Sequence, residues 1–423
     1  MIPRHPHSAS PWSVDKIQAG KKRKTALYWF LLFCCLCFSG CAAAPAPITD
    51  QSGDPDLAEL LESIRTRERL PALAAAVVLD GKIHAAAAVG TRRASTSHWV
   101  SVDDKFLIAS CSKAFTATLS AVLIRKGVIQ WSTTLKEAFP DLEMRDEYEN
   151  ITLMQLLSHR AGLPEWIDHL TSKNLTRRFM DDWWHDRQSP VTMRANYVKE
   201  TVKQRLDERP GRSIYYSNSG YLIAGAMLEK MMGKPFEQLM SEEMFTPMGL
   251  RTAGFGPPVK LDSENQPVGH SGVSRAVHPG DFPDYMAPTA AIHISIKDWA
   301  KFILVHLGSG ENAWAALDAH TLRTLHSPPD SATWRAGAEE IGYGIPSLNY
   351  ALGWYTMDMD DKEGLLWHPG GNTGFIAQVV ADPERKNAVL LATNVRASHS
   401  HLFKAMRTIK AHYSPAADLP GIE

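Results

Sequence analysis

Four short apolar segments near the C-terminus constrain the fold most strongly. They span residues 351–357, 365–368, 375–381 and 388–394, and the pair Asp382-Pro383 separates the last two. Short apolar runs bounded by turn-forming residues are typical of β-strands. Strands joined by tight turns pair antiparallel, because parallel strands need a long crossover. The segments therefore predict an antiparallel meander.

A second pair of strands is predicted near the start of the globular part. Residues 74–79 and 83–89 are largely apolar, and Asp80-Gly81 between them is a dipeptide typical of hairpin turns. If this hairpin joins the meander in one sheet, the domain is discontinuous and the residues between the two form an insert.

Helical patterns account for most of the remaining chain. We expect helices at residues 57–69, 114–126, 152–159, 220–232, 236–245, 296–307, 318–325 and 400–412. The region from about 128 to 286 is helical and rich in loops. The sequence therefore predicts an α+β fold, in which an antiparallel sheet is flanked by helices and carries an inserted, mostly helical subdomain.

The first 41 residues differ from the rest. A basic cluster at residues 21–24 precedes an apolar run at 26–38 and the small residues before Cys41, which is the layout of a secretory signal. Residues 38–41 resemble a bacterial lipobox, with Phe38 where leucine is usual, so we expect Cys41 to be lipidated. The alternative is an uncleaved anchor at 27–44. Both readings predict export and membrane attachment, followed by a linker at 42–56.

Composition and charge limit the classes of function that the chain can have. The chain has 423 residues, 44% hydrophobic and 22% charged, enough for a large core. Removing the +5 of residues 1–41 from the formal −1 leaves −6, so nucleic-acid binding is not indicated. Cys111 is the only cysteine after Cys41, so no internal disulfide is expected. Its spacing from Phe115 and Val122 predicts a thiol that faces the core rather than a nucleophile.

The tetrapeptide from Ser110 to Lys113 is the clearest candidate for catalysis. An apolar strand is predicted at 106–109 and a helix from 114 to 126, so Ser110 lies where a helix begins. Residues three apart share a helix face, so the Lys113 amine can reach the Ser110 hydroxyl and accept its proton. The pattern alone is weak, because Ser13 and Lys16 match it too, and a capping serine beside a surface lysine is the alternative.

Two further motifs support the catalytic reading. Tyr216-Ser217-Asn218 precedes a predicted helix, and Trp367-His368-Pro369-Gly370-Gly371 ends a predicted strand. With Ser-x-x-Lys, these resemble the three signatures of serine beta-lactamases and penicillin-binding proteins, closest to the class C branch. Supporting stretches at 156–164, 210–211, 352–354 and 393–394 are also similar. The resemblance covers about residues 57–412, leaving a tail at 413–423.

The resemblance implies a role for each matching residue. Ser110 is the nucleophile, Lys113 the proton acceptor, and Tyr216 the general base and then acid. Asn218 is expected to bind the substrate amide or to orient Lys113, and His368 and Gly370 to bind substrate. The backbone N–H groups of Ser110 and Gly371 are expected to form the oxyanion hole. His159 and a tryptophan group are expected to form scaffold or pocket wall; the group is Trp166, Trp183 and Trp184.

The third motif departs from the lactamase pattern. His368 stands where the family has lysine, and Pro369 replaces the hydroxyl residue that contacts a substrate carboxylate. The sequence therefore favours an exported serine hydrolase acting on an ester or amide through an acyl-enzyme on Ser110. The alternatives are a beta-lactamase or D,D-peptidase acting on cell-wall peptides, and a catalytically silent sensor. We expect a small-molecule or peptide substrate and no metal or cofactor.

Overall fold

The fold is described from a computed structural model of the full chain. It describes residues 52–164, 188–258, 265–271, 276–277, 284–309, 316–334, 348–359, 362–372, 374–396 and 399–413. All of these belong to the compact unit Thr49–Glu423. The predicted leader with Cys41, the second Ser-x-x-Lys match, the three tryptophans named above and residues 414–423 lie outside the described residues.

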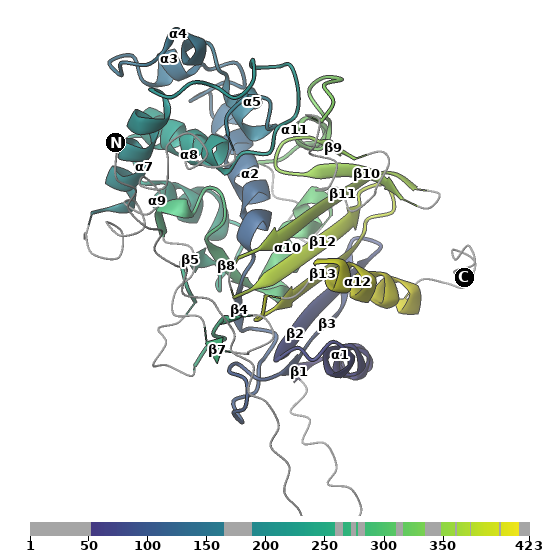
Figure 1. Ribbon diagram of the computed structural model, residues 1–423. Coiled ribbons are helices and arrows are strands. Elements are labelled where there is room, and N and C mark those ends of the chain that lie inside the picture. Colours follow the sequence, from purple (N-terminus) through teal and green to yellow (C-terminus); the bar gives the residue numbers. More distant parts are fainter. Residues whose placement is uncertain are drawn as a thin grey trace, which may run out of the picture. The chain divides into compact units, whose positions relative to one another are not determined.

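Among the described residues, eight strands form one sheet in the order β1-β3-β2-β13-β12-β11-β10-β9 (Figure 1). Their bounds are β1 Ser52–Gly53, β2 Ala72–Leu79, β3 Lys82–Gly90, β9 Asn349–Tyr350, β10 Tyr355–Met359, β11 Lys362–Gly371, β12 Ile376–Asp382 and β13 Asn387–Thr393. All neighbouring pairs are antiparallel, and β13 pairs with β2, which joins the predicted meander to the predicted hairpin. The predicted antiparallel sheet is confirmed, and so is its discontinuity in the sequence.

Helices cover both faces of this sheet. One face packs on α1 (Pro55–Arg67) and α12 (His399–Tyr413), and its buried side chains include Val77, Val380 and Val389. The opposite face packs on α2 (Ser112–Arg125) and α10 (Ile296–His306), with Ala76 and Val379 among its buried side chains. The alternation of side chains along each strand supplies both faces with apolar residues. The flanked α+β architecture predicted from the sequence is confirmed.

The inserted region is mostly helical. In the part of the insert that the structure describes, the helices are α3 Leu135–Ala138, α4 Asp146–Glu149, α5 Leu153–Leu157, α7 Pro190–Thr201, α8 Asn218–Met232, α9 Phe236–Met240, the π-helical η3 Ser241–Phe245 and the 3-10 helix η4 Asp284–Met286. Buried Arg194 on α7 pairs with Glu229 on α8 and Glu237 on α9, and also donates to the carbonyl of Tyr285 in η4. Removing one partner from such a buried cluster is costly, so these contacts fix the four elements together.

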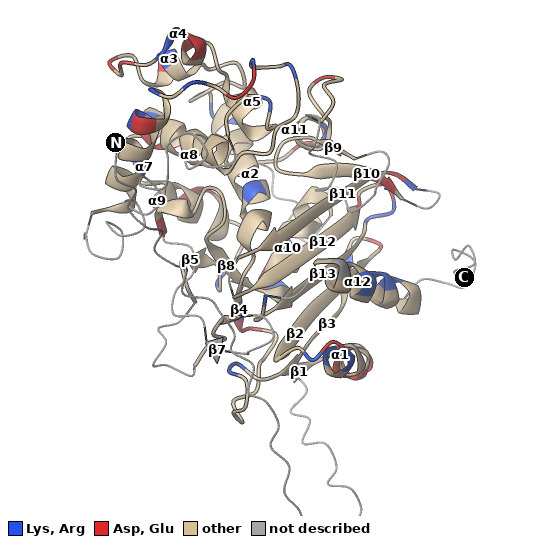
Figure 2. Ribbon diagram, in the orientation of Figure 1, with Lys and Arg blue, Asp and Glu red and all other residues tan. Residues whose placement is uncertain are grey.

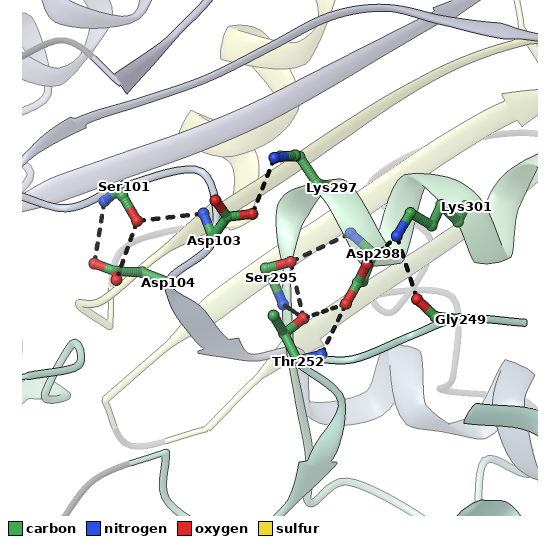
Figure 3. Close-up of polar contacts among 9 residues, drawn as sticks. All are labelled: Ser101, Asp103, Asp104, Gly249, Thr252, Ser295, Lys297, Asp298 and Lys301. Carbon is green, nitrogen blue, oxygen red and sulfur yellow. Dashed lines mark hydrogen bonds and ion pairs between the residues drawn. The ribbon is translucent and has the colours of Figure 1, made fainter. Parts of the chain in front are cut away.

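The insert also supplies the short strands β5, β6 and β7, which the periodicity did not predict. Strand β5 (Gly254–Phe255) pairs with β8 (Ile292–Ser295), which pairs with β4 (Lys105–Leu107). A further short pair joins β6 (His270–Ser271) to β7 (Ala276–Val277). Figure 3 shows the junction between β8 and α10, where the Ser295 side chain caps the helix by accepting from the N–H of Asp298. The hydroxyl of Thr252 donates to the Asp298 carboxylate at 2.7 Å. This junction anchors β8, and β8 in turn holds β4.

Several predicted boundaries differ in the structure. The linker predicted to reach residue 56 ends earlier, because β1 pairs with β3 and Asp54 caps α1. The strand predicted from 351 begins at Tyr355, because Gly353 adopts a positive φ of 80° that makes a turn. The helix predicted at 152–159 ends at Leu157, and the helix expected at 318–325 is α11 (Ala319–His326). Among the described residues, no helix is both long and apolar enough to cross a membrane.

Candidate active site

Ser110 lies in a strained turn between β4 and α2. The preceding residue, Ala109, has a positive φ of 45°, an unfavourable conformation for a residue with a side chain. The turn is held by β8, because the N–H of Ile108 donates to the carbonyl of Ile292 and the N–H of Ile292 donates to Oγ of Ser112. Ser110 itself is partly exposed, as a nucleophile requires.

Lys113 is fully buried directly beneath Ser110. Its Nζ lies 3.3 Å from Oγ of Ser110, 2.7 Å from Oδ1 of Asn218 and 3.0 Å from the carbonyl oxygen of Thr289. An ammonium group has three donors, and these three acceptors match them. The sequence therefore brings the predicted nucleophile and its lysine into contact, as the spacing of three residues requires.

The second motif surrounds this lysine. Asn218 is the first residue of α8, and its Oδ1 accepts from both Lys113 and the Thr289 hydroxyl, the latter at 2.9 Å. The ring centroid of Tyr216 lies 4.9 Å from Nζ of Lys113. Ser217 caps α8 by accepting from the N–H of Gly220. Tyr216 and Asn218 therefore face Lys113, whereas Ser217 shapes the backbone that presents them.

His159 holds the second motif in place. Its Nδ1 accepts from the N–H of Ser217 at 3.0 Å, and its ring centroid lies 4.3 Å from that of Tyr216. Burial, with the charge of Lys113 as a smaller cause, lowers the pKa of His159 well below the usual value. A neutral ring that accepts at Nδ1 carries its proton on Nε2. These contacts are those of a scaffold residue, the role that the sequence predicted for His159.

The third motif forms the end of β11, but its histidine points into the protein. His368 is fully buried, and its Nδ1 lies 2.7 Å from the carbonyl oxygen of Pro369, so Nδ1 carries the proton. Its Nε2 accepts from the hydroxyl of Tyr350 at 3.0 Å. Burial, followed by the charge of Lys113, lowers the pKa of His368 to about 3. At neutral pH His368 is therefore uncharged, and both of its ring nitrogens are hydrogen-bonded within the protein. Its predicted contact with substrate stays a prediction.

The glycines of the third motif bring β11 against the nucleophile turn. A Cβ on Gly370 would lie 2.1 Å from the carbonyl oxygen of Ile108, so only glycine permits this approach. Gly370 and Gly371 pair with the first residues of β12. Cys111 is buried and donates to the carbonyl of His368, and burial raises its pKa. These facts support a core role for Cys111; the oxyanion-hole roles of Ser110 and Gly371 stay predictions.

Two residues complete the site. Thr289 contacts both Lys113 and Asn218, but it lies in a loop after η4 and belongs to no motif, so no sequence pattern points to it. Gly353 belongs to the stretch 352–354, which resembles the corresponding family stretch, and the structure shows what this glycine packs against. A Cβ there would lie 2.8 Å from the carbonyl oxygen of Lys113 and the Cα of Ala114, so Gly353 packs directly on α2.

Comparison with known proteins agrees with this geometry. The Beta-lactamase family model matches residues 57–413. The chain is 26% identical over 380 residues to an unguisins hydrolase of Aspergillus campestris, covering 85% of this chain but only 65% of that protein. It is 24% identical to penicillin-binding protein 4 of Amycolatopsis lactamdurans, covering 79% and 84% of the two chains.

Solved structures show the same fold. The octameric penicillin-binding protein homologue from Pyrococcus abyssi superposes with a TM-score of 0.67 at 19% identity, covering 84% of this chain and 77% of that one. A beta-lactamase/D-alanine carboxypeptidase from Pseudomonas syringae gives a TM-score of 0.64 at 17% identity, covering 85% and 100%. The fold is thus that of the penicillin-binding proteins and beta-lactamases. The chain belongs to the beta-lactamase family of serine hydrolases.

Proposed function

We propose that this chain is an exported serine hydrolase that cleaves an ester or amide through an acyl-enzyme on Ser110. The observation that carries the proposal is the buried Lys113 ammonium, 3.3 Å from Oγ of Ser110 and beside the ring of Tyr216. The Ser110 oxygen bonds to the substrate carbonyl carbon, and its proton passes to the phenolate of Tyr216, the form that the Lys113 ammonium stabilises. Tyr216 then gives that proton to the leaving group as the bond between the leaving group and the carbonyl carbon breaks. Water then cleaves the acyl-enzyme and frees Ser110.

The third motif supports a substrate that carries no carboxylate beside the reacting carbonyl. Beta-lactams and D-Ala-D-Ala peptides carry one, and a fixed cation is suited to hold it. His368 is uncharged at neutral pH and bonded to Tyr350, and Pro369 has no hydroxyl to donate. The position that anchors an anion in lactamases therefore offers neither a charge nor a side-chain donor here.

A beta-lactamase or D,D-peptidase is the second candidate, because relatives with those names share the fold and family. The test compares kcat/KM of the full chain for a short-chain p-nitrophenyl ester, a chromogenic cephalosporin and a D-alanyl-D-alanine peptide, with Ser110→Ala as the blank. We expect the ester to be the best of the three. Faster turnover of the cephalosporin or the peptide would favour the second candidate. No turnover of any compound, with no Ser110 adduct, would favour a silent sensor.

Export and lipid anchoring are part of the proposal and rest on the first 41 residues. The basic cluster, the apolar run and the lipobox-like residues 38–41 support lipidation of Cys41. Metabolic labelling with a tagged fatty acid in a bacterial host tests this, with Cys41→Ser as the matched variant. We expect labelling that the variant loses. Unlabelled protein in the membrane fraction would favour the uncleaved anchor instead.

A further inference from the structure

A cavity lies on the sheet face opposite α2. It is a groove of about 470 Å³ between α12 and the strands that α12 covers. Val77, Val380 and Val389 line it from the sheet, and Phe403 and Met406 line it from the helix. This volume falls within the range of small-molecule sites, and apolar walls are typical of them. Ser110 precedes α2, which packs on the other face, so the groove is separate from the candidate active site.

The rim of the groove is predominantly basic. Its charged lining consists of the cations Lys362, Arg385, Arg407 and Lys410 and the carboxylates Asp80 and Asp382. Asp382 pairs with Arg385 at 3.3 Å, which engages one charge of each sign and leaves the lining with two more cations than carboxylates. Within the fifteen residues of α12 there are basic residues and no aspartate or glutamate, as Figure 2 shows for the helix as a whole. The groove is therefore complementary in charge to an anion.

Lys362 is the most informative of these cations. It is the first residue of β11 and lines the groove, yet it is only 9% exposed. Among the residues that the structure describes, its ammonium has no hydrogen-bond or ion-pair partner. The aliphatic stem of Lys362 accounts for this burial, because its ammonium is not among the fully buried polar atoms and keeps access to the solvent-filled groove. An anionic group bound in the groove would supply that partner.

We propose that this groove binds a free fatty acid, with its carboxylate on Lys362 and its chain on the apolar walls. A single apolar chain with one anionic end matches a narrow apolar site whose rim is cationic. A two-chain phospholipid carries the same chemistry but is larger than the ligands that cavities of this size hold. The proposal concerns a site away from Ser110 and does not depend on the proposed hydrolase activity.

The test is calorimetric titration of the full chain with dodecanoate below its micelle-forming concentration. We expect saturable binding at one site. Lys362→Met should weaken it about tenfold or more, because a charge-assisted contact is lost. Lys362→Arg should retain binding, and 1-dodecanol should bind more weakly than dodecanoate. Lys404→Met is the matched control, because Lys404 is exposed on the same helix but does not line the groove.

The proposal would be overturned if dodecanoate showed no saturable binding, or if Lys362→Met bound it as tightly as the wild type does. It would also be overturned if Lys362→Met and Lys404→Met lost affinity for dodecanoate to the same extent. Binding only to phosphatidylglycerol vesicles would identify a membrane surface instead and would also overturn it. Near-ultraviolet circular dichroism checks the fold of each variant. If Lys362→Met does not fold, Arg407→Met replaces it, and unchanged affinity in that variant would count against the site.

Discussion

Nζ of Lys113 donates a hydrogen bond of 2.7 Å to Oδ1 of Asn218, a residue 105 positions further along the chain. The contact joins the first turn of α2 to the first residue of α8, and Thr289 adds a second donor to the same oxygen. One amide oxygen thus links the insert to the helix that follows the nucleophile. The proposed activation of Ser110 depends on these contacts between Lys113, Asn218 and Thr289.

Tyr216→Phe should lower acylation of Ser110 by roughly a hundredfold or more, because positioned proton transfer typically contributes that much. The ring contacts to His159 and Tyr355 remain, so the fold should be unchanged. Stopped-flow measurement of the acylation burst gives the rate. Tyr215→Phe is the matched control and should behave as wild type. Equal rates for both variants would remove Tyr216 from the mechanism.

Thr289→Val should reduce kcat/KM about tenfold, because the hydroxyl that orients Asn218 is lost. Thr289→Ser keeps the hydroxyl and should restore activity. Thr116→Val is a control that loses a comparable buried hydrogen bond, to the carbonyl of Pro288, without contacting Asn218. Both valine variants should lose about 1 kcal/mol of unfolding free energy, but only Thr289→Val should lose activity. If activity falls equally in both, the role of Thr289 is structural.

A comparison of Gly353→Ala with Gly233→Ala distinguishes the free-energy cost of backbone strain from the cost of a clash with α2. Both glycines have positive φ, but a Cβ on Gly233 has nothing within 4 Å, whereas one on Gly353 would press on the backbone of Lys113. We expect Gly233→Ala to cost about 1 kcal/mol with normal activity. Gly353→Ala should cost roughly 2–4 kcal/mol and reduce kcat, because α2 must shift. Urea unfolding and ester hydrolysis measure the two quantities; normal kcat in Gly353→Ala would contradict the packing role.

His293 should make the protein less stable in acid. Burial lowers the pKa of His293 from 6.5 to about 4. The hydrogen bond to the carbonyl of Gly256 raises this pKa but is the smaller effect. Below pH 6.5 the unfolded chain binds a proton that the folded chain does not accept until about pH 4, so stability falls across that window. His293→Gln should reduce the slope of unfolding free energy by up to about 1.4 kcal/mol per pH unit. The exposed-histidine variant His320→Gln should leave the slope as it is; identical slopes in all three proteins would refute the assignment.

The sheet and the main helices could be predicted from the sequence because their signals are local. The hairpin turn at Asp80-Gly81 and the apolar runs of β11 to β13 are read directly from neighbouring residues. Strand β5 could not be predicted, because two residues carry no periodicity and their pairing with β8 is tertiary. The late start of β10 follows from the turn at Gly353, whose positive φ is set by packing on α2.

The site was predictable where residues belong to a motif. Ser110, Lys113, Tyr216 and Asn218 were predicted, and the structure brings them together. Thr289 was missed because its contribution is a loop carbonyl and a hydroxyl with no spacing signature. The replacement of lysine by His368 is visible in the sequence, but only the structure shows that the ring is buried against Tyr350. Burial and side-chain direction depend on distant elements and cannot be read from one segment.

The most direct test of the central claim is mass spectrometry of the folded protein after treatment with a fluorophosphonate. We predict a single adduct on the peptide that contains Ser110, much slower in Lys113→Met and absent in Ser110→Ala. Circular dichroism confirms that each variant is folded. Folded wild-type protein with no adduct on Ser110, or a Lys113→Met variant modified at the wild-type rate, would contradict the claim that Ser110 is a nucleophile activated by Lys113.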